Sequence, residues 1–463
     1  MASLELYSHR TTIDQQTNAA VSLNKIRGTR AQWRFRGALR GTRMLSPAPH
    51  GRLLATAIAL AMVLALAAVM TESAQAQNYS VIYNFTGGAD GAMPMAGLTT
   101  DGVNTFFGTA NFGGIVGGPC GSHGCGLVYR LNNNGSGWTV TPLYSFMGGA
   151  DGQNPENASV VFGPDGPLYS STFFGGGGCG APGCGIVFKL WPSNGAGPST
   201  PWAETILHRF NDMDGAGPVG AVVFDHFGNI DGATNAGGFN NGGVVYQLNQ
   251  SSGWQEFVLF HPYGYPGSGL TMDHAGDLYG TTFDAGTHLY GSVYKLTPSG
   301  SGFTSTDLYD FTNGSDGAYP KAGVILDAQG NIYGATSTGG SGKGGTIFKL
   351  TYSNGQYSYS TLYSLPSPSN GRLISGPIGN LTLDSSGNLY GTTFSDGAHS
   401  CGAVFKLTSS HGSWTYTSLH DFTNGSDGGF PYSSLVIDSH GNLYGTASTG
   451  GASGAGVVFE ITP

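Results

Sequence analysis

Two matching pairs of cysteines are the residues of this chain whose type and spacing most clearly indicate chemistry. Four residues separate Cys120 from Cys125, and four separate Cys179 from Cys184. Closely spaced cysteines in an exported chain typically form disulfides, and the amino terminus described below indicates export. The spacing therefore predicts one disulfide within each of two equivalent loops.

A zinc site is the alternative for these cysteines. His123 and His399 lie in comparable loops, and cysteine together with histidine suits zinc. Cys401 matches the second cysteine of each pair but has no first cysteine before it. We expect it to carry a free thiol.

A second recurring group is an aspartate followed by glycine, in the loop that enters a repeated unit. Five of seven units have it, and the fourth and sixth do not; the aspartates are Asp90, Asp151, Asp214, Asp316 and Asp427. Asp-Gly commonly shapes turns, which is the structural interpretation. The functional interpretation is a broken ring of carboxylates that binds Ca²⁺ or a polyhydroxylated ligand. We expect no other cofactor.

Motifs of known catalytic sites are weak in this chain. A glycosidase needs two carboxylates on either side of the scissile bond. The glutamates after the leader are Glu156, Glu204, Glu256 and Glu460, and none lies in a recurring motif. No nucleophile elbow, phosphate-binding loop or dinucleotide fingerprint stands between a strand and a helix. We therefore assign no catalytic residue.

The elements that must position these residues are strands of a repeated unit. A pattern like VFKL starts at residues 128, 187, 245, 293, 347, 404 and 458. A pattern like NLYGTT starts at residues 105, 167, 229, 277, 331, 388 and 442. Two further strands complete each unit, one ending in the turn aspartate and one rich in Trp, Tyr and Thr. Four strands in each of seven units predict an all-β, seven-bladed β-propeller.

The two ends of the repeat array complement each other. The stretch from Asn78 to Phe85 matches a fourth strand, and VFEITP at the end of the chain matches a third. We expect these strands to pair and close the ring, which leaves no open sheet edge. A solenoid is the alternative, but it would need capping ends. The glycine of LYGTT is expected to leave room for an aromatic ring of the adjacent blade.

The LYGTT strand, the glycine-rich loop and GAVFKLT together carry a family resemblance. From about Tyr79 to Pro463 the chain resembles the GloVer tandem-repeat family of secreted bacterial proteins. The resemblance implies a repeat fold and secretion, but no established activity and no catalytic residues. Anchored members carry a sorting tail, which is not found before Pro463, so we expect release or retention in the periplasm.

The amino-terminal residues predict export. An apolar run from Leu53 to Met70 follows Arg43 and Arg52 and precedes Ala74-Gln75-Ala76, which is typical of a secretory signal. We expect cleavage between Ala76 and Gln77, a signal peptide over residues 44–76, and the propeller over residues 77–463. Residues 1–43 are expected to be untranslated or a disordered leader. A membrane anchor is the alternative for the apolar run.

Charge limits the partners of the processed chain. Nine of the 18 basic residues and three of the 27 acidic residues precede Gln77, which leaves 9 basic and 24 acidic residues. With neutral histidines the net charge is −15. Such a surface repels phosphate backbones and anionic lipid, so we expect no nucleic acid and no membrane partner.

Strand order predicts which face of the propeller binds. The Asp-Gly loops and the cysteine loops should open on one face, and the short turns of the DSSGN type on the other. We expect a ligand between the loops at residues 111–127 and 173–185 and the carboxylates of Asp90 and Asp151. The predicted function is a secreted or periplasmic, monomeric binding or scaffold module for an extracellular saccharide or protein. The alternative is a polysaccharide hydrolase or lyase that uses loop aspartates.

Overall fold

The structure, a computed structural model, describes residues 77–463 except residues 103, 194–201, 301 and 368–375. The chain divides into two units, residues 1–74 and 75–463, and the fold below is that of the second. Within the described residues, no helix has the length and apolar character needed to cross a membrane. The predicted leader and signal peptide lie outside the described residues. Cleavage between Ala76 and Gln77 therefore stays a prediction.

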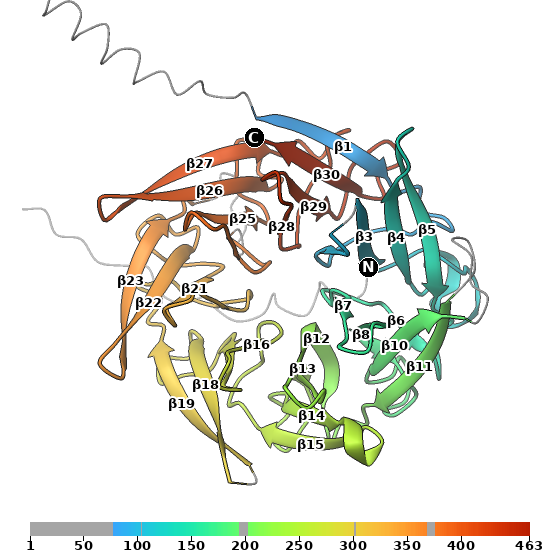
Figure 1. Ribbon diagram of the computed structural model, residues 1–463, viewed down its shortest axis with the longest axis horizontal. Helices are drawn as coiled ribbons and strands as arrows, with labels where there is room; N and C mark the ends of the chain where they lie inside the picture. The colour runs from blue at the N-terminus through green and yellow to red at the C-terminus, as the bar shows by residue number, and fades with distance from the viewer. Residues whose placement is uncertain (1–76, 103, 194–201, 301, 368–375) are drawn as a thin grey trace, which may run out of the picture. The chain divides into compact units, whose positions relative to one another are not determined.

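Seven four-stranded antiparallel sheets form a ring, as Figure 1 shows. Within each sheet the strands run in chain order from the centre of the ring outward, and the last sheet takes its outermost strand from the start of the repeat array. This arrangement confirms the predicted seven-bladed β-propeller. Each sheet is called a blade below, and the packing layer between two neighbouring blades is called a seam.

The strands of each blade are given from the innermost to the outermost. Blade 1 has β2 (Thr99–Thr100), β3 (Thr105–Ala110), β4 (Leu127–Asn133) and β5 (Trp138–Ser145); blade 2 has β7 (Val161–Phe162), β8 (Leu168–Thr172), β10 (Ile186–Pro192) and β11 (Trp202–Arg209). Blade 3 has β12 (Ala216–Phe224), β13 (Ile230–Ala236), β14 (Val245–Asn249) and β15 (Gln255–Phe260); blade 4 has β16 (Thr271–Met272), β17 (Leu278–Thr282), β18 (Ser292–Ser299) and β19 (Gly302–Asp310). Blade 5 has β20 (Ile325–Leu326), β21 (Ile332–Ala335), β22 (Thr346–Ser353) and β23 (Gln356–Ser364); blade 6 has β24 (Thr382–Leu383), β25 (Leu389–Thr393), β26 (Ala403–Ser410) and β27 (Ser413–Asp421). Blade 7 has β28 (Val436–Ile437), β29 (Leu443–Ala447), β30 (Val457–Thr462) and β1 (Asn78–Asn84); outside the blades are the paired β6 (Gly152–Gln153) and β9 (Phe174–Gly175) and the short 3₁₀ helices η1 (Gly118–His123) and η2 (Gln250–Ser252).

The ring closes through β1, which pairs antiparallel with β30 from Asn78 opposite Thr462 to Asn84 opposite Val457. One bulge between Val81 and Tyr83 interrupts the register. The closure confirms the prediction made from the complementary ends. Because β1 covers β30, the last blade presents the same outer edge as the other six.

Short turns connect the first and second strands of a blade, and an aspartate organises them. Asp384 accepts hydrogen bonds at Oδ1 from the backbone N–H groups of Ser386 (2.9 Å) and Asn388 (2.8 Å). Its Oδ2 accepts from the Asn388 amide and from the Tyr390 hydroxyl, at 2.7 and 3.1 Å. Burial raises the pKa of Asp384, but these hydrogen bonds outweigh it and hold the pKa below its ordinary value. The aspartate thus satisfies backbone donors of its own turn.

The glycine of the LYGTT strand makes room for an aromatic ring, but the ring belongs to the same blade. A Cβ at Gly391 would lie 2.6 Å from Cζ of Phe405, and the two residues are paired across β25 and β26. The expectation of a ring from the adjacent blade was wrong. The reason is register, because directly opposite residues on paired strands share one face of the sheet.

The seams hold the core of the molecule. After the outermost strand of a blade the chain places one apolar side chain into the seam with the next blade, and we call this the plug position. Five of these side chains are phenylalanines that pack on a third-strand aromatic ring of the next blade with centroids 5.1 to 5.4 Å apart: Phe85, Phe146, Phe210, Phe311 and Phe422. All five are fully buried. Leu365 has the same role at the seam of blades 5 and 6, against Phe405.

Candidate functional site

The predicted disulfides are present. Cys120 is bonded to Cys125 and Cys179 to Cys184, so these sulfurs are not arranged as zinc ligands. Cys401 forms no disulfide, as predicted, and its thiol donates to the carbonyl oxygen of His399 at 3.3 Å.

Each disulfide-bonded loop forms a hydrogen bond with the next blade. The loop that leads from the fourth strand of one blade to the first strand of the next is called an entry loop. The carbonyl of Cys125 accepts a 2.8 Å hydrogen bond from the N–H of Asn154 in the entry loop of blade 2. The Cys184 carbonyl accepts one of the same length from Gly217 at the start of β12 in blade 3. The cysteine loops therefore hold the chain where it enters blades 2 and 3.

Entry loops and the loops after the second strands open on one face, as predicted. The two kinds of loop are bridged within a blade, at Ala92 with Phe112, at β6 with β9, at Ala318 with Thr338 and at Gly429 with Thr449. The cysteine loops and the Asp-Gly loops consequently share this face.

The five aspartates of the Asp-Gly loops are engaged in the turns that carry them. Asp316 shows the pattern: Oδ2 accepts from the N–H of Thr312 (2.7 Å) and the hydroxyl of Tyr309 (3.2 Å). Its Oδ1 accepts from the Thr312 hydroxyl at 2.7 Å and the Gly314 N–H at 3.0 Å. Each of these carboxylates lies beside the outer strand of the preceding blade rather than at the centre of the ring.

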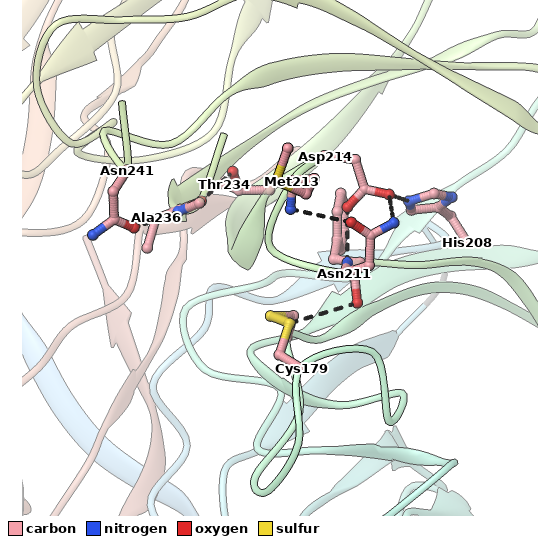
Figure 2. The surroundings of a disulfide bond; sticks show 11 residues. Cys179, His208, Asn211, Met213, Asp214, Thr234, Ala236 and Asn241 are labelled. Carbon is pink, nitrogen blue, oxygen red and sulfur yellow. Dashed lines mark hydrogen bonds and ion pairs between the residues drawn. A yellow bond between two sulfur atoms is a disulfide. The ribbon is translucent and has the colours of Figure 1, made fainter. Parts of the chain in front are cut away.

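The other four aspartates repeat this geometry. Figure 2 shows Asp214, which accepts from the N–H of Asn211 at 2.8 Å and lies 3.2 Å from Nε2 of His208. The equivalent backbone donors are Thr86 for Asp90, Met147 for Asp151 and Thr423 for Asp427. Among the described residues, no three His, Cys, Asp or Glu side chains form a group that could hold a metal ion. A role of the five aspartates in binding Ca²⁺ or a ligand stays a prediction.

At one seam an aspartate meets a second carboxylate. The hydroxyl of Tyr144 lies 3.2 Å from both carboxylate oxygens of Asp151 and 3.2 Å from Oε2 of Glu204 on β11. Burial, and then the charge of Asp151, raise the pKa of Glu204 to about 8. The other oxygen of Glu204, Oε1, is buried without a hydrogen-bond partner. Two carboxylates therefore meet at one tyrosine hydroxyl in the seam of blades 1 and 2.

A different part of the entry loops reaches the centre of the ring. Each ends in a proline, and the residue before it has positive φ in Met93, Asn154, Tyr319 and Phe430, between 51° and 56°. Positive φ is uncommon for bulky residues and is maintained only where the surroundings require it. The proline after each of these four residues packs against the glycine that precedes a third strand; a Cβ at Gly291, for example, would lie 2.4 Å from Cδ of Pro320. This turn directs the residue after the proline toward the channel at the centre of the ring.

These next residues form a ring of seven, one from each blade. In chain order they are Met95, Glu156, Val219, Gly267, Lys321, Ile378 and Tyr432. Six of them line a cavity of about 110 Å³, and blade 2 contributes Asn157 and Ser159 to it. All seven blades therefore supply residues to this cavity, which we call the channel-mouth pocket. Five of the seven entry loops share the Asp-Gly motif and every blade has the proline, whereas the side chain after the proline is apolar, acidic, basic or aromatic from blade to blade.

Lys321 gives the lining of the pocket its charge, and Glu156, which is not among the lining residues, is near enough to interact with it. Burial raises the pKa of Glu156 and lowers that of Lys321, and their mutual attraction opposes both shifts. The ammonium of Lys321 lies 5.3 Å from the centroid of the Phe283 ring, which stacks on Tyr319 at 4.9 Å. This cation–π contact holds the Lys321 side chain at the pocket. Within the described chain, no ion pair of 4.0 Å or less joins Lys321 to Glu156.

Polar groups complete the lining. Asn380 Oδ1 accepts from the N–H of Gly323 at 2.7 Å and lies 3.5 Å from the hydroxyl of Ser268. Ser159, Ser433 and Ser434 also line the pocket. The arrangement can bind a small polar molecule through one ammonium group, amides and hydroxyls.

Sequence reasoning missed this pocket. Neither Glu156 nor Lys321 was predicted as a site residue, and both precede the innermost strands, in the entry loops. The signal was available, because the residue after the entry-loop proline is the one that changes chemically between otherwise similar loops. The ligand position predicted between the cysteine loops and Asp90 and Asp151 is not among the lining residues of the channel-mouth pocket.

The fold and the pocket define a seven-bladed β-propeller built from one repeated unit, with a polar pocket at the mouth of its channel. The model of the Gloeobacter/Verrucomicrobia repeat matches residues 67–264 and 265–463, and the chain belongs to this family. The predicted resemblance is thus confirmed. No curated protein matches the chain significantly.

Solved structures of other propellers are similar to this chain at low identity. A putative 6-phosphogluconolactonase from Bacteroides uniformis is 14% identical, with 72% of this chain and 95% of that one covered and a TM-score of 0.44. A glucose dehydrogenase is 12% identical over 83% and 99% of the chains, with a TM-score of 0.43. A gluconolactonase from Xanthomonas campestris is 14% identical over 66% and 89%, with a TM-score of 0.36. Similarity at this level gives no basis for assigning an activity.

Proposed function

We propose that the protein is an exported binding module that holds one unit of an extracellular saccharide in the channel-mouth pocket. The observation that carries the proposal is the ring of seven residues, in which a constant scaffold presents a different side chain from each blade. A cavity of about 110 Å³ is smaller than the roughly 150 Å³ that encloses benzene, so it suits the carboxylate-bearing edge of a terminal sugar ring rather than the whole ring.

The lining favours a hydroxyl-rich unit that carries a carboxylate. Lys321 is the one charged residue among the lining residues and is placed to pair with an anionic group. Asn380, Asn157 and the serines offer donors and acceptors for hydroxyl groups. Glu156, next to the lining Asn157, can accept hydrogen bonds from hydroxyls at the same side. A uronic acid unit meets these requirements.

Export is part of the proposal. Two disulfides are present in the chain, and such bonds persist in oxidising compartments. The net negative charge of the repeat region suits a protein that avoids anionic surfaces.

A protein partner is the second candidate, favoured by exposed apolar side chains on the loop face of blades 1 to 4. They are Ile115, Val116, Met147, Met213, Phe239 and Leu289, each more than half exposed. Large exposed apolar side chains that gather on one face are typical of interaction sites. For this candidate, a partner captured by the full chain should be lost with I115S and V116S.

The hydrolase or lyase alternative needs two carboxylates across a glycosidic bond or an equivalent acid and base. The loop aspartates that it would use each accept a backbone N–H of their own turn and at least one further hydrogen bond from a side chain nearby. The structure therefore offers this alternative no observation comparable to the channel-mouth pocket.

A glycan array tests the proposal with the full chain. We expect binding to glycans that end in an acidic sugar, and we expect K321M and N380A to lose at least about tenfold in affinity while the fold is retained. Product release from any bound glycan is then measured, and binding without release supports a binding module. Binding that K321M and N380A leave unchanged would place the ligand elsewhere.

A further inference from the structure

The seam of blades 3 and 4 differs from the others at the plug position. Phe260 pairs with Val245 in blade 3, and Tyr309 pairs with Val293 in blade 4, so Phe260 and Tyr309 hold equivalent positions. Pro262 and Phe311 each lie two positions further on, so they are equivalent too. From this strand end to the entry-loop proline, blade 4 has five residues where blade 5 has ten, residues 261–265 against 310–319. The seam of blades 3 and 4 therefore has neither a plug phenylalanine nor an Asp-Gly loop.

A cavity of about 210 Å³ lies where the plug is missing, and we call it the seam pocket. Pro262 lines it, and so does Tyr294, the third-strand aromatic that a plug phenylalanine would cover. Replacing a large side chain by a small one leaves a cavity when the surroundings do not collapse. The seam pocket shares no lining residue with the channel-mouth pocket.

One buried polar atom beside the seam pocket has no hydrogen-bond partner. It is Oδ1 of Asp310, which lies where a Cβ of Gly286, a lining residue, would clash at 2.0 Å. The Tyr294 hydroxyl is also buried without a partner, but it lies against Gly280, which does not line the pocket. Buried polar groups without partners are costly, so a molecule in the pocket that bonds to Oδ1 of Asp310 would be stabilised.

The remaining walls are aromatic and hydroxylic. Phe260 packs on Tyr294 with ring centroids 5.6 Å apart, and Tyr263 stands at the rim with 91% of its surface exposed. Thr282 and Ser292 also line the pocket, and their hydroxyls are hydrogen-bonded to each other at 2.8 Å. Aromatic faces pack against the C–H face of a sugar ring, while hydroxyls and carboxylates bond to its hydroxyl groups.

Charge sets the class of ligand. Asp307 is the one charged residue among the lining residues of the seam pocket, and Asp310 is close behind it in the chain. An anionic ligand would meet these carboxylates without a lysine or arginine in the lining to balance them. The pocket also exceeds the roughly 150 Å³ that encloses benzene, so it admits a ring with its substituents.

We propose that the seam pocket is a second binding site, for one neutral pyranose ring. It forms because the entry loop of blade 4 is short and Pro262 replaces the plug phenylalanine. The site does not depend on the function proposed for the channel-mouth pocket.

The test uses the full chain and four probes: the methyl glycosides of glucose, galactose, mannose and glucuronic acid. Saturation-transfer NMR measures binding of each. We expect at least one neutral glycoside to bind, and P262F, which restores the plug, to weaken that binding at least about tenfold. The melting temperature of P262F should be equal to or higher than that of the wild type, because the cavity is filled.

Two further variants keep the outcome interpretable. Y263A removes an exposed side chain and should weaken neutral glycosides by about tenfold without a change in melting temperature, so it replaces P262F if that variant fails to fold. K321M should leave the neutral glycosides unaffected and weaken only the glucuronide, which separates the two pockets. The proposal is overturned if no neutral glycoside binds, if the glucuronide competes for the same site, or if P262F and Y263A bind as the wild type does.

Discussion

The five aspartates of the entry loops and the two charged residues at the channel mouth, Glu156 and Lys321, lie on the same face. They differ in whether the surrounding turn satisfies their polar groups. Asp316 and its four equivalents recur, and each is surrounded by donors from its own turn. Glu156 and Lys321 occur once each, are partly buried, and lie in loops whose other residues repeat. In a repeat protein, satisfied and recurring polar groups build the fold, while groups that depart from the repeat are the better candidates for binding.

Removing a recurring element should have the largest effect. Deletion of residues 77–86 takes away β1, exposes the edge of β30 and removes the plug Phe85. We expect loss of cooperative folding or aggregation, because an open edge recruits other chains. Thermal unfolding and light scattering measure this. A truncated chain that melts like the parent would show that ring closure contributes little.

The next largest effect is expected from the loop aspartates. D90A combined with D151A leaves the N–H groups of Thr86 and Met147 without their acceptors. We expect a loss of roughly 1–3 kcal/mol in the free energy of unfolding, as for other broken hydrogen bonds.

The same double variant tests the predicted carboxylate ring. If Asp90 and Asp151 bind a ligand, the variant should lose glycan binding at a nearly unchanged melting temperature. Early unfolding with retained binding would instead mark both residues as turn formers and sharpen the contrast with Glu156 and Lys321.

A smaller effect that depends on pH is expected at Glu204. Its pKa is about 8 in the folded protein against an ordinary value of 4.5, so the folded state retains a proton that the unfolded state loses. The stability from this group is fully present below pH 4.5 and is lost as the pH rises to about 8. E204Q keeps a neutral side chain at every pH. It should match the wild type at pH 4 and melt higher above pH 8, by roughly 2–4 °C.

The control for this prediction is E460Q. In blade 7 the hydroxyl of Tyr444 lies 2.8 Å from Glu460 and 3.3 Å from Asp438, so Glu460 also meets an aspartate through a tyrosine. Unlike Glu204, Glu460 has no buried oxygen among the described atoms that lack a hydrogen-bond partner. Melting curves of both variants across pH separate a carboxyl-specific effect from a general change in charge. Parallel curves for E204Q and the wild type would mean that Glu204 ionises normally.

The smallest effect on stability is expected at the channel mouth. K321M removes a partly buried ammonium group, whose pKa burial lowers, and keeps most of the side-chain volume over Phe283. We expect a free energy of unfolding within roughly 0.5 kcal/mol of the wild type, together with the loss of binding described above. A strong loss of stability would place Lys321 with the structural groups and remove the contrast.

Most of the fold could be predicted because its determinants are local. The DSSGN turn satisfies its own backbone through Asp384, and strand alternation follows from the residues of LYGTT and VFKL. Seven copies of such a unit permit few arrangements, and the complementary ends selected a closed ring. The disulfides were predictable for the same reason, since five positions separate each pair of cysteines.

The sequence by itself thus determined the blades, their number, the closing strand and the loops that share a face. Only the tertiary structure decided which side chains meet at the centre and in the seams. Glu156 and Lys321 lie 165 positions apart in the chain. Pro262 leaves a pocket because it puts no aromatic ring against Tyr294. Such contacts depend on how neighbouring blades pack, and no local pattern encodes the space that remains between them. The two pockets were therefore visible only once the ring was assembled.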